Sequence, residues 1–576
     1  MKKFHRFLLP AIAILSSWTQ APRAMAQLAP NASIFGPNVL LFDPSMDAAK
    51  IQSQCNAIFT KQERSQFGPA RYAILFKPGA YKVDVNVGFY TQVSGLGRMP
   101  GDVTINGDVH ADGKWFGGNV TQNFWRACEN LTIVPAKNGA SKWAVSQAAP
   151  MRRVHIEGNL ALSENGWASG GFLADSLIDG RVSSGSQQQW FSRNNTWGGW
   201  TGGNWNMFFL GCAPAPAGTW PDRPYTIVEK TPIIREKPFL FADAAGKYAV
   251  FVPAIRRDSI GCSWQAAPPA GEVIPIEKFH IAQAAKDTAA SMNAALAAGK
   301  NLLLTPGIYH LKDSIRVTRP GTVVLGLGLA TLLPDTGAPA MLVSDVDGVS
   351  LAGILFDAGS QESPALLVVG EPGSAKDHSQ NPTFLYDLFC RLGGATAGSA
   401  TVSMIINSRN VVGDHFWIWR ADHGQGVGWT VNKGRNGLVV NGADVTLYGL
   451  FVEHYQEDQV QWNADGGRTY FFQSEMPYDP PGNSVWKHGT VKGWPGYKVA
   501  DKVNTHEAWG LGIYCVFQKN ALSESAIEAP DKPGVKFHNA LSYRLGGKGD
   551  GISNVINKTG GEARPKAQVL EYPPAK

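Results

Sequence analysis

The sequence predicts an all-β protein made of two right-handed parallel β-helix domains in one chain, each with a capping helix at its N-terminal end. Three observations predict this fold. The segment Ala73–Tyr81 recurs at Leu302–Tyr309, each copy follows one helical stretch, and each copy precedes many short apolar runs broken by Gly, Asn and Asp. The composition agrees, because 64 Gly, 36 Pro and only 17% charged residues are typical of a turn-rich β protein.

The two helical stretches are Ala48–Lys61 and Ala282–Ala298, in which apolar residues fall at helical spacing. The first coil of a strand stack has an open edge with unpaired backbone groups, and a helix can cover it. We therefore expect each helix to cap one stack, and the duplication indicates two stacks in one chain.

The recurring segments share the pattern Pro-Gly-x-Tyr and are followed by Gly95–Gly97 and Gly326–Gly328, which both read Gly-Leu-Gly. Short runs rich in Val, Ile, Leu and Phe follow each copy and have the length of single strands. Representative runs are Val103–Gly107, Asn130–Val134, Val349–Phe356 and Val445–Val452.

The predicted domain organisation follows from these repeats. Residues 27–265 are expected to form the N-terminal β-helix domain and residues 276–576 the C-terminal one. Between them, residues 266–275 combine Pro with small residues and are predicted to be a linker.

Residues 1–26 have the features of a secretory signal peptide: basic residues, an apolar run, and a small-x-small site that ends at Ala26. A membrane-spanning helix needs about 20 apolar residues, and Pro10 and Ser16 interrupt this run. We expect a secreted or periplasmic protein cleaved after Ala26. Cleavage removes four basic residues of 52 and leaves 48 against 46 acidic ones. Since no basic stripe remains, we expect neither nucleic acid nor a membrane surface as a partner. A near-neutral surface instead suits an uncharged polymer.

Six cysteines are scattered without CxxC pairs or histidine spacing, which argues against a zinc site. Cys212 and Cys262 are one candidate local pair if disulfides form after export. Six cysteines allow 15 pairings, and the sequence does not choose among them.

Two glutamates, Glu453 and Glu475, are the first candidates for chemistry. They lie 22 residues apart, which is about one turn of a solenoid, and both follow strongly apolar runs. Adjacent rungs are about 4.8 Å apart, and a diagonal offset opens two carboxyls toward the roughly 6.5–9.5 Å used by inverting glycosidases. Charged residues in such apolar strands are rarely there for stability. The alternative is that both are ordinary polar residues at the rim of a sheet.

A polar and aromatic region follows the middle of the first half. Gln187, Gln188 and Gln189 lead into Trp190, and glycines separate the tryptophans that come after it, among them Trp200 and Trp205. Glycines leave gaps in a packed strand, and sugar rings stack on indoles, so this region suits a saccharide groove. The same tryptophans would also serve to brace the interface between the two stacks.

Two further regions combine acids, histidines and aromatic residues. Asp422 and His423 are adjacent and precede Trp429, although a histidine beside an aspartate is more often structural. Glu507 follows His506 and is the reserve candidate for a carboxylate that binds substrate.

Taken together, the motifs resemble glycoside hydrolase family 55, within the pectin-lyase-like superfamily. The resemblance covers nearly the whole chain after residue 26, and the block from Glu453 to Glu475 is its most specific part. The motifs that carry it are the duplicated Pro-Gly-x-Tyr and Gly-Leu-Gly segments, Ser169–Asp175, Gln187–Trp190, Arg420–Gly424, Gly449–His454 and Gln473–Asp479.

This resemblance implies an exo-acting, inverting β-1,3-glucanase with its groove between two β-helices and with no cofactor or metal. It implies that Glu475 is the general acid, that Glu453 holds the attacking water, and that Gln188 helps to hold that water. His454 and Tyr478 lie in the same motif and are expected to contact substrate. The family also uses a serine near the end of the following strand, whereas the aligned stretch Phe208–Gly211 contains none.

The mechanism sets requirements on the two acids. Met476 and Phe472 beside Glu475 are expected to desolvate it and raise its pKa, as suits an acid, whereas hydrogen bonds from Gln or His neighbours are expected to keep Glu453 charged. A hydrolase of another neutral glycan, a polysaccharide lyase and a non-catalytic glycan-binding β-helix remain alternatives. A lyase of this architecture would need acids clustered for calcium and a positive groove. We expect the chain to act as a monomer.

Overall fold

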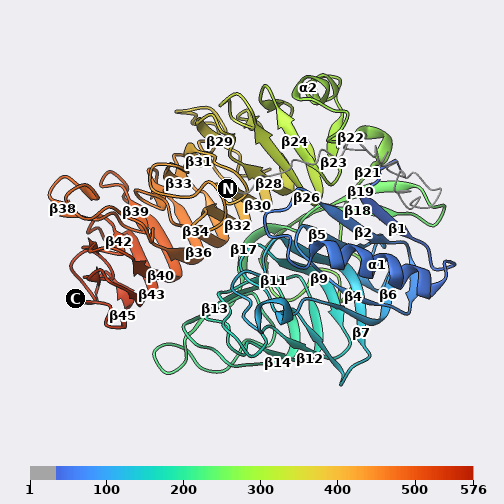
Figure 1. The fold of residues 1–576 in the computed structure, drawn as a ribbon, viewed down its shortest axis with the longest axis horizontal. Helices are drawn as coiled ribbons and strands as arrows, with labels where there is room; N and C mark the ends of the chain where they lie inside the picture. Colours follow the sequence, from blue (N-terminus) through green and yellow to red (C-terminus); the bar gives the residue numbers. More distant parts are fainter. Residues whose placement is uncertain (1–33, 575–576) are drawn as a thin grey trace, which may run out of the picture.

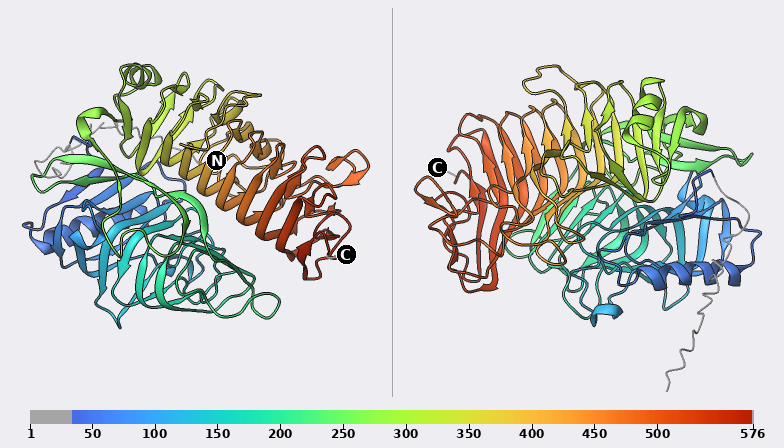
Figure 2. Two further views of the ribbon diagram at one scale, coloured as in Figure 1. Left: turned by 180° about the vertical axis from the view of Figure 1, so that it is seen from behind. Right: turned by 45° about the horizontal axis from the view of Figure 1, so that its top comes forward.

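The computed structural model describes residues 34–574, so the predicted signal peptide and its cleavage site lie outside the described residues. Two stacks of parallel strands lie side by side, one from each half of the chain (Figure 1), and the view from behind and the view tilted by 45° show the same arrangement (Figure 2). The predicted all-β fold with two parallel β-helix domains is confirmed.

The N-terminal stack is a 16-stranded sheet in which every strand pair is parallel. Its main ladder runs through β1 (Val39–Phe42), β2 (Tyr72–Phe76), β5 (Thr91–Gly95), β7 (Arg126–Pro135), β9 (Pro150–Ile156), β11 (Phe172–Ala174), β13 (Gln189–Arg193), β15 (Asn206–Leu210) and β16 (Tyr225–Val228). The other strands are β3 (Gly79–Tyr81), β4 (Asp84–Asn86), β6 (Val103–His110), β8 (Ala140–Lys142), β10 (Asn159–Ala161), β12 (Leu177–Ser183) and β14 (Thr196–Thr201).

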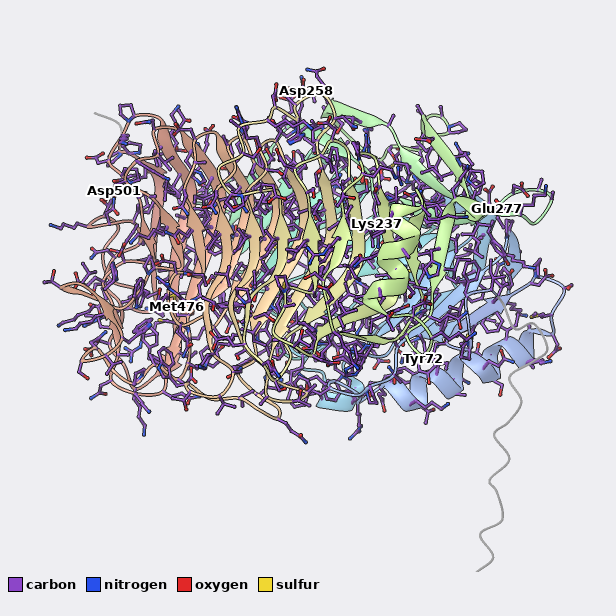
Figure 3. The ribbon with its side chains drawn as sticks, turned by 90° about the horizontal axis from the view of Figure 1, so that it is seen from above. Tyr72, Lys237, Asp258, Glu277, Met476 and Asp501 are labelled. Atoms are coloured by element: carbon purple, nitrogen blue, oxygen red, sulfur yellow. The ribbon has the colours of Figure 1, made fainter. Side chains whose placement is uncertain are left out.

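The C-terminal stack has two long sheets, and its strands run side by side when seen from above (Figure 3). The first contains β22 (Phe279–Ala282), β23 (Asn301–Leu304), β24 (Ile308–Leu311), β26 (Val323–Pro334), β28 (Ser350–Asp357), β30 (Phe384–Leu392), β32 (Val412–Arg420), β34 (Thr446–Glu453), β36 (Gly467–Glu475), β40 (His506–Phe517), β43 (Val535–Gly547) and β45 (Lys566–Tyr572). The second contains β25 (Ile315–Val317), β27 (Met341–Val343), β29 (Ser363–Val369), β31 (Ala400–Ile406), β33 (Gly434–Val440), β35 (Val460–Trp462), β39 (Tyr497–Val499) and β42 (Ile527–Glu528).

One helix lies at the start of each stack. The first, α1 (Ala48–Gln62), begins at Asp47, whose side chain accepts a hydrogen bond from the backbone N–H of Lys50. The second, α2 (Ala289–Ala297), begins at Thr288 in a reciprocal cap with Ser291. It starts later than the predicted residue 282 because Phe279–Ala282 forms strand β22.

The duplicated segments adopt the same local structure. The hydroxyl of Tyr81 donates to the carbonyls of Phe42 and Lys77. The hydroxyl of Tyr309 donates to the matching carbonyls of Ala282 and Thr305. In both copies, therefore, the tyrosine ties the turn after one strand to the end of the strand before it.

Apolar side chains form three large cores. One core lies inside the N-terminal stack, one inside the C-terminal stack, and a third contains residues of both halves, including Phe172, Phe208, Trp417 and Phe451. The third core joins the faces that the two stacks turn toward each other. It therefore fixes the position of one stack against the other.

The connection between the stacks differs from the predicted linker. The parallel ladder of the N-terminal stack ends at β16, well before residue 265. Antiparallel strands follow, and the last of them occupies half of the expected linker: β17 (Thr231–Arg235) pairs with β20 (Ile255–Ser259), and β19 (Tyr248–Pro253) pairs with β18 (Phe239–Ala242) and β21 (Gly271–Pro275). Antiparallel pairing with β19 satisfies the backbone of residues 271–275, which composition alone does not reveal.

A bend recurs at one position in successive strands from β28 to β43. At each bend one residue has a left-handed backbone and is skipped in the strand pairing, for example Gly449 (φ 62) in β34 and Phe471 (φ 71) in β36. The bend reverses the alternation of sides. In β34, Leu447 before the bend and Leu450 and Val452 after it all face the C-terminal core.

Among residues 34–574, no helix has the length and apolarity needed to cross a bilayer. All six cysteines are free, so the candidate pair of Cys212 and Cys262 is not formed. The Sγ of Cys212 instead lies 3.7 Å from the carbonyl of Leu210, and that of Cys262 lies 3.5 Å from Oγ1 of Thr196.

Candidate active site between the two stacks

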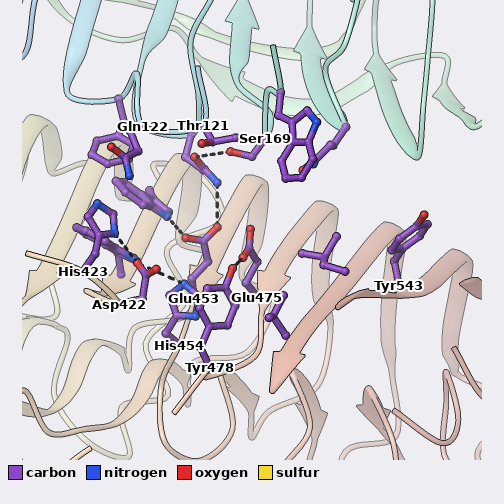
Figure 4. Close-up of a pocket in the computed structure, with 18 of the residues that line it drawn as sticks. Thr121, Gln122, Ser169, Asp422, His423, Glu453, His454, Glu475, Tyr478 and Tyr543 are labelled. Atoms are coloured by element: carbon purple, nitrogen blue, oxygen red, sulfur yellow. Dashed lines mark hydrogen bonds and ion pairs between the residues drawn. The ribbon is translucent and has the colours of Figure 1, made fainter. Parts of the chain in front are cut away.

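A cavity of about 680 Å³ lies between the two stacks, and both contribute to its lining. The N-terminal stack supplies side chains from its loops and strand ends, and the C-terminal stack supplies acids, histidines and aromatic residues (Figure 4). A cavity of this size is in the usual range for ligand pockets, roughly 300–1,000 Å³.

Glu453 and Glu475 end the adjacent strands β34 and β36 and point into this cavity (Figure 4). Phe451 pairs with Gln473, so the same register two residues later brings Glu453 opposite Glu475. The backbone N–H of His454 also donates to the carbonyl of Glu475 at 2.8 Å. The 22-residue interval thus corresponds to one turn of the stack, as the sequence predicted.

The bends in β34 and β36 explain why both acids face the cavity. Gly449 and Phe471 shift the alternation of side chains by one residue. After each bend, the odd-numbered side chains, such as Phe451 and Glu453, therefore lie on the face that packs against the N-terminal stack. Phe471 is a bulky residue in a backbone region that such residues rarely adopt. It lies four residues before Glu475 and sets the direction of that carboxyl.

Glu453 is only 3% exposed and is held by two N–H donors. Nε2 of Gln147 donates to its Oε1 at 3.0 Å, and Nε1 of Trp417 donates to its Oε2 at 2.9 Å. Oγ of Ser169 lies 3.4 Å from Oε1 of Gln147 and can donate to it. Glu453, Gln147 and Ser169 therefore form a chain of polar groups along the cavity wall.

Glu475 is partly exposed to the cavity and has one hydroxyl partner. The hydroxyl of Tyr478 donates to its Oε2. Tyr514 is paired with Glu475 on the next strand and is buried, which leaves the cavity as the open side of the carboxyl. This arrangement suits an acid that gives its proton to a ligand in the cavity.

Burial raises the pKa of both carboxyls. For Glu453 the negative charge of Glu475 adds to burial, and the N–H of Trp417 opposes it. For Glu475 the charge of His454 and the Tyr478 hydroxyl oppose the effect of burial. The hydrogen bonds of Glu453 therefore oppose its desolvation without outweighing it, so its pKa is raised.

The two carboxyls share one proton over a range of pH, because two buried negative charges this close repel each other. Both oxygens of Glu453 face N–H donors, which favour its ionised form. A hydroxyl, by contrast, can accept as well as donate, so Tyr478 tolerates a protonated Glu475. These contacts favour the shared proton on Glu475, although burial raises the pKa of Glu453 well above its ordinary value.

Asp422 supplies a fixed negative charge beside this pair. Burial alone would raise its pKa, but the hydrogen bond from His423 and the charges of His454 and His423 lower the pKa to about 2. Oδ1 of Asp422 lies 3.0 Å from Nδ1 of His423 and 3.9 Å from Nε2 of His454. Nδ1 of His454 lies 3.1 Å from the Met476 carbonyl and so carries a proton.

Aromatic side chains form the walls. Trp417 and Trp419 stack at 4.9 Å on one side, and Trp205 stacks on Tyr543 at 4.2 Å on the other. Trp167 is 73% exposed at the rim. Aromatic walls combined with many polar groups suit a sugar chain, which presents both C–H faces and hydroxyls.

The structure brings many of the predicted site residues together in this cavity. They are Glu453, Glu475, Gln188, Trp205, Asp422, His423, His454 and Tyr478. Gln188, however, has no hydrogen bond to Glu453, and Gln147 occupies that place. That Gln188 helps to hold the attacking water stays a prediction.

Six residues predicted to contact substrate lie outside the cavity, because their side chains are engaged elsewhere in the fold. Gln187 and Gln189 are buried and bind backbone groups, and Trp190 lies in the N-terminal core. Trp200 packs on that same core, and Trp429 packs on the C-terminal core beside Arg420. Glu507 accepts a hydrogen bond from His538 on strand β43. Glycine spacing and chain neighbours did not reveal which face each side chain takes.

Gln147, Trp417 and Trp419 also line the cavity, although they were not among the predicted site residues. Ser169 lies in the cavity as well, on the rung after Gln147. Gln147 and Ser169 are 22 residues apart, the same interval as Glu453 and Glu475. That shared period was the signal available in the sequence.

Comparison with known proteins gives four matches. Residues 279–475 match the family model of the LAM55 pectate lyase-like domain. An exo-β-1,3-glucanase of Streptomyces sp. (strain SirexAA-E / ActE) is 49% identical over 558 residues, which is 96% of this chain and 91% of the relative. The solved structure of sacteLam55A from Streptomyces sp. SirexAA-E covers 94% of this chain and 99% of its own, with a TM-score of 0.91 and 49% identity. A glutamate-to-alanine variant of that protein, solved in complex with glucose, matches equally well.

Proposed function

The chain belongs to glycoside hydrolase family 55, as its sequence motifs suggested, and from this premise we propose that it is an exported, inverting exo-β-1,3-glucanase. The observation that carries the proposal is the pair of carboxyls, Glu453 and Glu475, on adjacent strands in one cavity. The name of the Streptomyces relative supports the substrate and the exo mode. The sequence of residues 1–26 supports export.

Glu475 acts as the general acid. It donates its proton to the oxygen of the scissile glycosidic bond, which becomes the hydroxyl of the departing chain as the bond to the anomeric carbon breaks. Burial raises the pKa of this carboxyl and so keeps the proton available above the ordinary range of a glutamate. Tyr478 holds the carboxyl in position.

Glu453 acts as the general base. A water molecule attacks the anomeric carbon from the face opposite the leaving oxygen, and Glu453 takes one of its protons. Gln147 and Trp417 hold the carboxylate oxygens, and Ser169 orients Gln147. Attack from the opposite face inverts the anomeric configuration.

The remaining groups position the sugar. Trp417 and Trp419 are almost fully buried and form a rigid part of the cavity wall, and Asp422 offers a charged acceptor for sugar hydroxyls. Trp205 and Tyr543 line the other side of the cavity, where further glucose units of the glucan can lie.

A substrate panel tests the proposal. Purified protein is incubated with laminarin, lichenan, β-1,6-glucan, arabinan and pectin, and the sizes of the products are followed from the first minutes. We expect laminarin to be cut and small sugars of one size to be released while the polymer shortens slowly. Early release of mixed oligosaccharides would contradict the exo mode, and cleavage of pectin alone with rising ultraviolet absorbance would indicate a lyase.

A further inference from the structure

A second cavity, of about 530 Å³, lies in the C-terminal stack and shares no lining residue with the first. Its floor is formed at the last rungs of the second sheet, by β39 and β42. Two other segments close its sides: the hairpin of β37 (Lys487–His488) and β38 (Val491–Lys492), and the loop of residues 554–558. Figure 3 shows Asp501, at its rim, apart from Met476, which follows Glu475.

Three charged side chains form a fixed group in this cavity. Glu528 accepts from Nζ of Lys498 at 2.9 Å and lies 3.0 Å from Nε2 of His488. Each of the three side chains is less than 30% exposed. Burial raises the pKa of Glu528, but its bonds to His488 and Lys498 lower it further, so the carboxyl stays ionised. An ionised, doubly bound carboxylate cannot act as a general acid, so Glu528 is unsuited to that role.

Other polar groups of the cavity are free to meet a ligand. Within residues 34–574, Oδ1 of Asn554 and the ammonium of Lys558 have no hydrogen-bond partner, whereas Nδ2 of Asn554 is anchored on the Glu524 carbonyl. Oε1 of Glu524 accepts from the backbone of Lys492, which leaves its second oxygen available. Asn554 and Glu524 thus present acceptors on anchored side chains, and Lys558 adds a donor.

The charges of the lining almost balance, which favours a neutral ligand. Asp501, Glu524 and Glu528 face Lys498 and Lys558, and His488 adds partial positive charge. Val491, Val499, Ala500 and Ala529 give the cavity an apolar side as well. A ring with hydroxyls at its edge and C–H groups on its faces fits this combination.

We propose that this second cavity is a non-catalytic site that binds a short stretch of the same neutral polysaccharide. The inference rests on the proposed function, which supplies the polymer. A chain bound at both cavities gains from effective concentration, because the second contact becomes intramolecular. The site therefore holds the enzyme on long or insoluble glucan and leaves the cleavage of short oligosaccharides unaffected.

Two variants and one control test the inference. Ala529→Trp fills the cavity, and the double variant Asn554→Ala/Lys558→Ala removes polar groups without filling it. Ala375→Trp, at an exposed alanine outside both cavities, is the matched control. Each is made in wild type for kinetics on a β-1,3-linked trisaccharide, and in the Glu475→Gln background for binding to insoluble β-1,3-glucan without hydrolysis.

We expect at least about tenfold weaker retention on insoluble glucan for both cavity variants, with kcat/KM on the trisaccharide and retention of the control unchanged. Unchanged retention of the double variant would overturn the inference, whatever Ala529→Trp does. If the wild-type protein does not cleave the trisaccharide at all, the proposed function itself is rejected. Failure of the second binding site and failure of the proposed function therefore give different results.

Discussion

Glu475→Gln is expected to lower kcat on laminarin by about 10²–10⁴-fold, because the amide cannot protonate the leaving oxygen. Binding should be retained, since the amide occupies the same volume and Tyr478 still has an acceptor. An aryl β-glucoside with a strongly acidic leaving group needs no proton, so the variant should lose far less activity on it. Steady-state kinetics on both substrates measure this difference.

The same variant makes a prediction about pH. Burial raises the pKa of Glu475, and the acid works only while protonated, so wild-type activity falls as pH rises through that raised pKa. Glu475→Gln has no proton to lose, and its residual activity should not show this alkaline limb. Glu507→Gln is the control, because Glu507 lies outside the cavity. Equal losses on both substrates, with the limb intact, would remove Glu475 from the role of acid.

Glu453→Ala is expected to lower kcat by about 10²–10⁴-fold on laminarin and on the activated glucoside alike. The attacking water needs a base whatever the leaving group is, which separates this variant from Glu475→Gln. Removing the carboxyl also leaves the donors of Gln147 and Trp417 unpaired, so the free energy of unfolding should fall by about 1–3 kcal/mol. A urea titration shows whether the variant is folded under the assay conditions.

Azide provides the decisive control for Glu453→Ala. It is a nucleophile that needs no base, and it can enter the space of the lost carboxyl. It should restore turnover by bonding to the anomeric carbon as the glycosidic bond breaks and Glu475 protonates the leaving oxygen. The product is then the α-glucosyl azide. Rescue that gives the β-azide, or full activity without azide, would exclude Glu453 as the base.

The fold and the principal pair of acids were predictable because a solenoid repeats in sequence as well as in space. The 22 residues between Glu453 and Glu475 measure one turn, and the duplicated tyrosines, Tyr81 and Tyr309, make the same bonds at the start of each stack. Such a period can be read from the sequence without knowing the conformation of the loops. Gln147 and Ser169 are separated by the same 22 residues, but this interval was not used to predict them as site residues.

The face of the strand on which each side chain lies could not be predicted from this periodicity. Phe471 shifts the alternation in β36 through a left-handed backbone that no sequence rule assigns to phenylalanine. Trp190 was predicted to contact sugar but lies in the core of the N-terminal stack. Which face of β13 its side chain occupies depends on the orientation of that strand in the stack, which the local sequence does not specify. The pKa of Glu453 depends on burial between two stacks that lie far apart in the sequence.

The anomeric form of the first product tests the central claim most directly. Proton NMR of laminarin hydrolysis, recorded before mutarotation equilibrates the sugars, shows which anomer the enzyme releases. With Glu475 as acid and Glu453 as base on opposite faces of the linkage, the initial product is the α-anomer. Initial release of the β-anomer would mean retention through a covalent intermediate and would contradict the assignment of both residues.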